Sequence, residues 1–162
     1  MKIRLLTLDD WQIWRSLRLE ALLNAPETLA SSYQEAKSFS QEEWEDKLTK
    51  SDIFVAFINN KLIAAVGFRR LNRLKTMHRG DLFAMYVTPE YRGQGIASQL
   101  IDVIINHAKS RVIQLHLSCV TNNESAVKLY QKHGFKIYGM EPRSLKIDDD
   151  FFDEYLMLLE FL

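Results

Sequence analysis

A short glycine-containing stretch between a predicted strand and a predicted helix carries the clearest chemical signal in this sequence. It reads Arg92, Gly93, Gln94, Gly95, Ile96 and Ala97. A turn of this kind presents backbone N–H groups at a helix N-terminus, where the helix dipole favours negative charge. Its small residues let the main chain approach a ligand closely, and its arginine adds a cation suited to phosphate oxygens. The stretch therefore predicts a cradle for a pyrophosphate group.

The spacing of this stretch differs from that of two common nucleotide-binding motifs. The phosphate loop of nucleotide hydrolases has a Lys-Ser or Lys-Thr pair after its last glycine, whereas Ile96 and Ala97 stand here. The dinucleotide fingerprint has three glycines at fixed spacing, and this stretch supplies two. On these residues alone, a turn without a ligand remains an alternative to the pyrophosphate cradle.

Another motif lies further along the chain and reads Asn123-x-x-Ala126-x-x-Leu129-Tyr130, followed by Gly134-Phe135. Together, the two motifs resemble the GNAT superfamily of N-acetyltransferases. The glycine motif, Arg92-x-x-Gly95-x-Ala97, is similar to that family's acetyl-coenzyme A motif, and the asparagine motif is similar to its other conserved block. The strong match covers residues 82–135, and the predicted order of elements extends the resemblance over nearly the whole chain.

The resemblance implies that acetyl-CoA is the co-substrate and assigns residues to it. The backbone N–H groups of the glycine motif would hold the pyrophosphate. The preceding strand would offer backbone groups to the pantetheine arm, as a peptide adds to an exposed strand. Asn123 would contact the same arm from the start of the next helix. The implied cofactor-binding residues are Met85, Tyr86, Val87, Arg92, Gly93, Gln94, Gly95, Ile96, Ala97, Asn123, Ala126 and Tyr130.

Tyr130 is the candidate catalytic residue. Attack of an amine on the acetyl thioester expels a thiolate, and a phenol within hydrogen-bond reach can protonate it. Reference pKa values of about 8.5 for a thiol and about 10 for a phenol make this transfer chemically reasonable. A helix residue that only packs on the sheet is the alternative interpretation. The matching spacing of Asn123 and Gly134-Phe135 favours the acid.

The general base stays unassigned. Some family members that acetylate protein N-termini carry a glutamate four residues before the motif's asparagine, and Cys119 stands there in this chain. The remaining candidates are Glu35, Asp81 and Glu154, or a water held by backbone carbonyls. A lone cysteine in a strand is more often a small buried hydrophobe than a nucleophile. We therefore expect direct transfer in a ternary complex rather than an acetyl-cysteine.

Hydrophobic periodicity predicts an α/β (α+β) fold in one domain covering residues 1–162. Asp9 or Asp10 would cap a first helix ending before Pro26, Ser40 with Glu43 forms a capping-box signature, and residues 27–39 are a short helix or a loop. Further helices are expected over 96–108 and 123–132, the latter closed by Gly134 at the position where a left-handed residue ends a helix. The predicted strands cover residues 3–6, 52–58, 61–71, 82–87, 112–120, 135–138 and 154–161.

This order of elements predicts a mixed, mainly antiparallel sheet of about six or seven strands with helices on both faces. The strand–helix–strand unit over residues 82–120 would form a right-handed parallel crossover. The resemblance also implies a splay between the two central parallel strands, which would leave main-chain groups free for the coenzyme.

Composition limits the partners and the environment. The chain has 162 residues, of which 21 are basic and 21 acidic, so electrostatics favour neither nucleic acid nor a membrane surface as partner. Cys119 is the single cysteine, which excludes an internal disulfide, and the histidines show no metal-ligand spacing, so we expect no metal. Without a signal peptide or an apolar run of ~18 residues, the expected protein is soluble and cytoplasmic.

Two hypotheses follow from these observations. One is an acetyl-CoA-dependent N-acetyltransferase acting on a primary amine, either a small molecule or a protein amine. The other is a non-catalytic module of the same fold that binds or senses acyl-CoA. Tyr130 favours the enzyme, whereas the missing base leaves room for the sensor. The acceptor is open, and the chain is compatible with a monomer or a homodimer.

Overall fold

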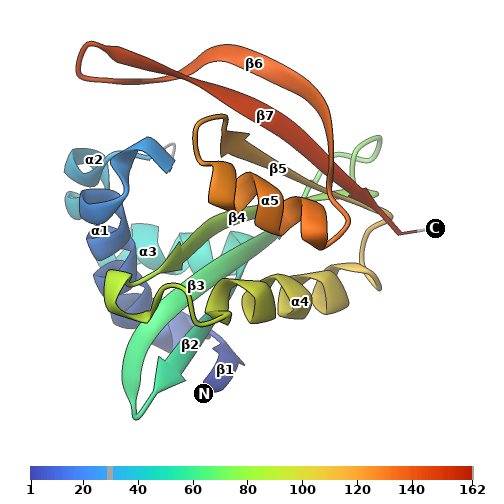
Figure 1. Cartoon of the computed structure of the whole chain (residues 1–162). Helices are drawn as coiled ribbons and strands as arrows, with labels where there is room; N and C mark the ends of the chain where they lie inside the picture. Colours follow the sequence, from blue (N-terminus) through green and yellow to red (C-terminus); the bar gives the residue numbers. More distant parts are fainter. Residues whose placement is uncertain (29–30, 162) are drawn as a thin grey trace.

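A seven-stranded sheet lies at the centre of the computed structural model, which describes residues 1–28 and 31–161 (Figure 1). The strand order is β1-β2-β3-β4-β5-β7-β6, and of the pairs in this order only β4–β5 is parallel. The strands are β1 (Lys2–Leu5), β2 (Asp52–Ile58), β3 (Lys61–Arg70), β4 (Arg79–Val87), β5 (Gln114–Val120), β6 (Lys136–Ile147) and β7 (Asp150–Glu160). This confirms the expected mixed, mainly antiparallel sheet.

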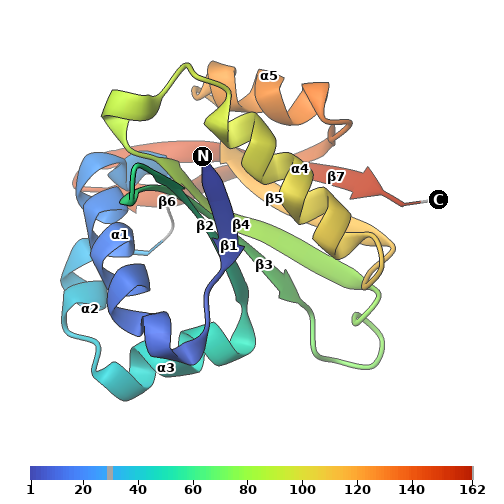
Figure 2. The ribbon, with the colours of Figure 1, turned by 90° about the horizontal axis from the view of Figure 1, so that it is seen from below.

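Helices cover both faces of this sheet, as Figure 2 shows. One face carries α1 (Trp11–Asn24), α2 (Tyr33–Lys37) and α3 (Gln41–Lys50), and the other carries α4 (Ile96–Ala108) and α5 (Glu124–Lys132). Three 3-10 turns, η1 (Leu8–Asp10), η2 (Pro26–Thr28) and η3 (Pro89–Tyr91), lie in the connections. The apolar face of α4 places Leu100, Ile101 and Ile104 in the core with no exposed surface, so this helix is held firmly against the sheet.

Local capping and turn signals were accurate guides to several boundaries. Ser40 Oγ accepts from Glu43 N at 3.2 Å while Glu43 Oε2 accepts from Ser40 N at 3.1 Å, which is the predicted capping box at the start of α3. Gly134 follows α5 with φ 96°, the left-handed conformation that ends helices. Such signals act within a few residues, so tertiary packing did not override them.

Several expectations about the elements were wrong. The strands expected to begin at residues 82 and 154 begin at Arg79 and Asp150. Asp10 precedes α1 but does not cap it, because its carboxylate accepts from the Thr7 backbone N–H at 2.8 Å and pairs with Arg4 at 2.8 Å. The strand expected over residues 135–138 extends through Ile147 as β6. Most side chains of this edge strand are exposed, so it lacks the alternation on which a strand prediction depends. In the segment 27–39, η2 and α2 form, while residues 29 and 30 lie outside the described residues.

The parallel strands β4 and β5 stay together over only three residue pairs. Their register runs Arg79↔Gln114, Gly80↔Leu115 and Asp81↔His116. Beyond Asp81, β4 continues alongside β3, and β5 continues alongside β7. The β5-facing main-chain groups of residues 82–87 therefore have no strand partner within the described parts of the chain. This confirms the expected splay.

The ion pair between Arg4 and Asp10 predicts a loss of stability in acid. Hydrogen bonds from Arg4 lower the pKa of Asp10 to about 2, with Thr7 contributing. Because the folded pKa lies below the unfolded value of about 3.9, the stabilisation is complete above about pH 4 and disappears as the pH falls towards 2. We expect Asp10→Asn to lower the free energy of unfolding at pH 7, because the ion pair is lost. The loss should be only about 1 kcal/mol, because the pair is partly exposed and solvent screens it.

Chemical denaturation between pH 2 and 7 measures this difference. Asp9→Asn is the matched control, since Asp9 is an exposed neighbour. A difference in the free energy of unfolding between wild type and Asp10→Asn that stays constant over the whole pH range would contradict the lowered pKa of Asp10.

Candidate active site

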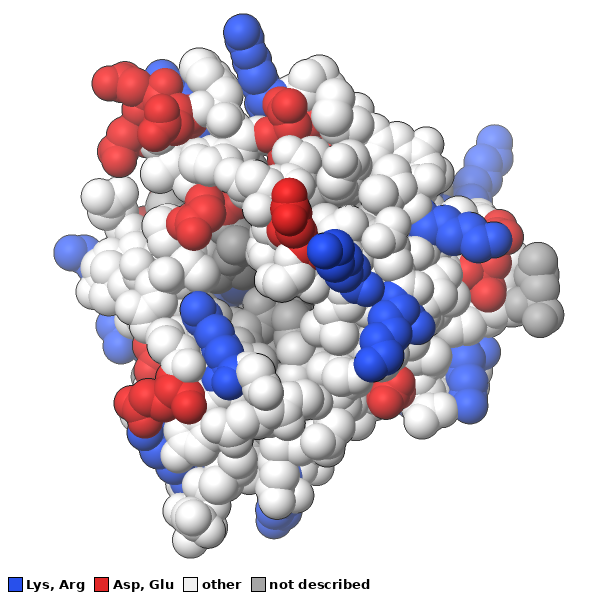
Figure 3. Space-filling model, in the orientation of Figure 1, with Lys and Arg blue, Asp and Glu red and all other residues white. Residues whose placement is uncertain are grey.

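A cavity of about 850 Å³ opens where β4 and β5 separate. Its walls are the second half of β4, the loop leading to α4, the end of β5 and the start of α5, with the end of α1 and η2 beside them. Figure 3 shows this hollow from the front, with both acidic and basic side chains near its rim. Residues of both sequence motifs line this one cavity, although the motifs lie at the starts of two different helices.

The glycines of the glycine motif adopt the conformations that their type permits. Gly93 has φ 75° and Gly95 has φ 80°, and Gly95 is the N-cap of α4. The first helical hydrogen bond runs from Gln99 N to Gly95 O at 3.2 Å, so the N–H groups of Ile96 and Ala97 precede the ladder. A Cβ added at either glycine would meet no atom within 4 Å. The loop therefore presents backbone donors at the start of α4 with open space beside its glycines, an arrangement that suits an anion.

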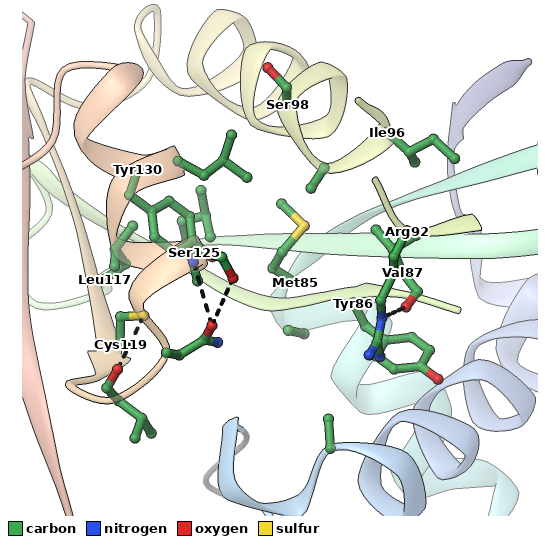
Figure 4. Close-up of a pocket in the computed structure, with 18 of the residues that line it drawn as sticks. Met85, Tyr86, Val87, Arg92, Ile96, Ser98, Leu117, Cys119, Ser125 and Tyr130 are labelled. Atoms are coloured by element: carbon green, nitrogen blue, oxygen red, sulfur yellow. Dashed lines mark hydrogen bonds between the residues drawn. The ribbon is translucent and has the colours of Figure 1, made fainter. Parts of the chain in front are cut away.

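Arg92 has a role that its sequence position did not reveal. Its Nε donates to Val87 O at 2.9 Å, and its guanidinium lies 5.6 Å from the centre of the Tyr86 ring (Figure 4). Arg92 is therefore both a cation in the cavity wall and a tie between the glycine loop and the end of β4. Because this tie holds the loop before any ligand arrives, the donors are ordered in advance.

The end of β4 carries an irregularity beside the cavity. The register of β3 with β4 shifts between Ala65 and Gly67, and Ala84 has φ 56°, which a non-glycine residue adopts rarely. A bulge of this kind bends a strand and redirects its side chains. Here Met85 faces the α4–α5 side and Tyr86 the other side, where its hydroxyl accepts from Asn24 Nδ2 at 3.0 Å. The bulge thus leaves Met85 in the cavity wall.

Tyr130 reaches the same cavity from α5 (Figure 4). Its ring meets Phe135 edge-on at 5.8 Å, and the Phe135 backbone N–H donates to Tyr130 O at 3.1 Å. No hydrogen bond engages its hydroxyl within residues 1–28 and 31–161. Burial, with a smaller contribution from Cys119, raises the pKa of this phenol far above its ordinary value. The group therefore holds its proton at neutral pH.

Asn123 caps α5. Its Oδ1 accepts from the Ala126 backbone N–H at 3.4 Å and from Ser125 Oγ at 3.3 Å. Asn123 and Ala126 both line the cavity, but the oxygen of the amide is already engaged in holding the helix start. Gln94, alone among the implied cofactor-binding residues, is not part of the cavity lining.

Cys119 is buried at the end of β5, and burial with the nearby charge of Glu154 raises the pKa of its thiol to about 11. A thiol with this pKa is neutral at physiological pH and is a poor nucleophile. Its nearest polar contact is a long one to Val120 O, at 3.8 Å. The side chain thus behaves as a small apolar group in the cavity wall.

The three carboxylates considered as bases all lie outside the cavity lining. Asp81 pairs with Arg69 at 3.2 Å, Glu154 accepts from Ser144 Oγ at 2.5 Å, and Glu35 is exposed on α2. The cavity instead contains Glu27, from η2. Sequence reasoning missed it because the weakly periodic segment after Pro26 showed no sign of which side chains it buries.

A polar chain ties α4 to the end of α5. Ser98 Oγ lies 2.8 Å from His133 Nε2, and His133 Nδ1 lies 3.1 Å from Asp102 Oδ1. These residue types are those of a hydrolase triad, but in Figure 4 Ser98 points away from Met85 and Tyr130. The chain is therefore a clamp between the helix of the glycine loop and the helix of Tyr130.

The described residues contain no cluster of three His, Cys, Asp or Glu side chains that could hold a metal ion. They also contain no helix that is long and apolar enough to cross a membrane.

Residues 11–135 match the model of the Acetyltransferase (GNAT) family, which covers most of the chain. The chain therefore belongs to the GNAT acetyltransferase family. A structure titled as a GNAT-family acetyltransferase from Streptococcus pneumoniae has a TM-score of 0.85 and 27% identity, covering 98% of both chains. The structure of yncA from Salmonella typhimurium with its cofactor acetyl-CoA has a TM-score of 0.83, covers 99% of this chain and 94% of that one, and at 16% identity supports the fold alone.

Curated relatives fall into several acceptor classes. N-alpha-acetyltransferase 30 of Schizosaccharomyces pombe is 35% identical over 86 residues, 52% of this chain and 57% of that protein. Spermidine N(1)-acetyltransferase of Escherichia coli K12 is 28% identical over 45% of this chain and 40% of that protein. The L-amino acid N-acetyltransferase AaaT of the same strain is 27% identical over 64% of each. The chain thus spans about half the length of the curated relatives it matches.

The left-handed conformation of Gly95 predicts a penalty for any side chain there. Gly95→Ala should lower the free energy of unfolding by about 1 kcal/mol, because an alanine Cβ is strained at positive φ even where space is open. Urea denaturation measures this change. Gly139→Ala is the matched control, since a Cβ there makes an ordinary contact of 3.6 Å with Leu156. Equal stability of the two variants would show that φ at Gly95 is not constrained.

Proposed function

We propose that this protein is an acetyl-CoA-dependent N-acetyltransferase that moves the acetyl group to a primary amine by direct attack in a ternary complex. The observation that carries the proposal is that one cavity brings the glycine loop and the free hydroxyl of Tyr130 together at the β4–β5 splay. Family membership and the names of the relatives support the same reaction class.

The donor side follows from the loop and the separated strand. The pyrophosphate would accept hydrogen bonds from the N–H groups of residues 93–97, assisted by the charge of Arg92. The pantetheine amides would pair with the open edge of β4 at Met85 to Val87, since these main-chain groups face the gap to β5. Asn123 and Ala126 would border the arm on the side of α5.

The chemical step needs a neutral amine and an acid. The amine nitrogen attacks the thioester carbonyl carbon, a C–N bond forms, the C–S bond breaks, and the sulfur leaves as a thiolate. The attacking nitrogen releases one proton to solvent as the amide forms. Tyr130 would donate its own proton to the departing sulfur and regain one from solvent. Since burial raises the pKa of the phenol, the acid is fully protonated before each turnover. The neutral thiol of Cys119 favours direct transfer over an acetyl-cysteine intermediate.

Calorimetry with acetyl-CoA and a screen of amines for thiol release test the proposal together. We expect saturable binding of acetyl-CoA and amine-dependent release of the coenzyme thiol. Binding without thiol release for any amine would identify a non-catalytic acyl-CoA sensor instead. Absence of binding would eliminate both functions.

The variant Tyr130→Phe tests whether the hydroxyl of Tyr130 is the general acid. This variant keeps the ring contact with Phe135, so we expect unchanged affinity for acetyl-CoA and a kcat about 10²-fold lower, the usual contribution of a general acid. Steady-state and single-turnover kinetics measure the loss. Tyr138→Phe, at an exposed tyrosine of β6, is the control. If kcat is unaffected while chemistry limits the rate, Tyr130 is not the acid.

A further inference from the structure

The cavity contains one charged side chain of each sign among the described residues that line it. Arg92 belongs to the wall made by β4 and the glycine loop. Glu27 belongs to η2, which packs against β5 and β6. The basic group thus lies with the anion-binding loop, and the acidic group lies on the other wall, away from that loop.

The carboxylate of Glu27 is available to bind a cation. Its side chain is half-buried, and it makes no hydrogen bond or ion pair within residues 1–28 and 31–161. Removing part of a carboxylate's hydration without supplying a partner costs free energy. The cavity walls beside it, including Cys119 on β5, are largely apolar or neutral, and no described side chain pairs with the carboxylate. A positively charged ligand would offset this cost.

Within the described chain, the end of β5 supplies no carboxylate to this wall of the cavity. At the end of β5 the cavity is lined by Cys119, whose thiol is neutral. The turn η2 lies against β5, and both Glu27 and Cys119 line the cavity. A carboxylate therefore reaches this wall from a different segment of the chain.

We propose that Glu27 binds the acceptor amine in its ammonium form, before that nitrogen loses a proton to water and attacks. Glu27 thereby selects the class of acceptor: amines without a carboxylate beside the reacting nitrogen, such as peptide N-termini and polyamines, over free amino acids. This inference rests on the acetyl-transfer function proposed above. A free α-amino acid whose amine meets Glu27 carries its own carboxylate on the same carbon as that amine, so the two negative charges would lie close together. At an effective dielectric constant of about 20, that repulsion weakens binding by tenfold or more.

L-leucinamide and L-leucine form the sharpest pair of probes, because they differ at a single carboxylate. Their amines also differ in basicity, so the informative quantity is the change in preference caused by a variant, which cancels that difference. With acetyl-CoA saturating, we expect wild type to prefer leucinamide and Glu27→Gln to reduce the ratio of the two kcat/KM values at least tenfold, mainly through a higher KM for leucinamide. The KM for acetyl-CoA should not change.

Glu42→Gln, at an exposed glutamate of α3, is the matched control and should keep the wild-type preference. An unchanged preference in Glu27→Gln would overturn the inference while leaving acetyl transfer intact. Failure of wild type to bind acetyl-CoA would instead refute the proposed function.

Calorimetry covers the case in which neither probe is turned over. Leucinamide is titrated into protein saturated with coenzyme A, using wild type and both variants. Binding that Glu27→Gln alone weakens at least tenfold supports the inference. Equal binding by wild type and Glu27→Gln, or no binding of leucinamide at all, overturns it.

Discussion

The separation of β4 from β5 is the constraint on which the rest of the structure depends. Parallel strands that part after Asp81 leave main-chain donors and acceptors facing a gap, and unpaired buried groups of this kind are costly. The fold tolerates the gap because each strand keeps its other neighbour, β3 for β4 and β7 for β5. The gap is then an extended, unsatisfied strand edge inside the molecule, which suits an amide-containing arm.

Side-chain ties on both sides keep this gap open in a defined shape. On the β4 side, Arg92 binds Val87 O, and Asn24 binds the hydroxyl of Tyr86, so the strand end is held from two directions. On the other side, the clamp through His133 joins α4 to the end of α5. The glycine loop and Tyr130 therefore belong to one connected framework. In the proposed reaction the phenol of Tyr130 must lie within hydrogen-bond reach of the sulfur, and this framework would hold it there.

The parts of the structure that sequence reasoning predicted are those governed by local rules. The capping box at Ser40 and the left-handed Gly134 each depend on neighbours within a few residues. The splay followed from the family resemblance, which itself rested on the two motifs. The tie from Arg92 to Val87 and the length of β6 were not predicted, because a tertiary hydrogen bond and an exposed edge strand leave no periodic signal in the chain.

The same distinction between local and tertiary features explains why the acetyl-CoA side of the proposed site is easier to predict from sequence than the acceptor side. A pyrophosphate is recognised by backbone N–H groups, which demand a particular loop conformation and therefore particular residues such as Gly95. An acceptor is recognised by side chains that any nearby segment can provide. Here the end of β5 carries Cys119, whose thiol is neutral, while a turn from another part of the chain brings in Glu27. Under the proposal made above, the charge of the acceptor wall thus comes from a segment remote in sequence from the glycine motif, so no short pattern in the chain could have identified it.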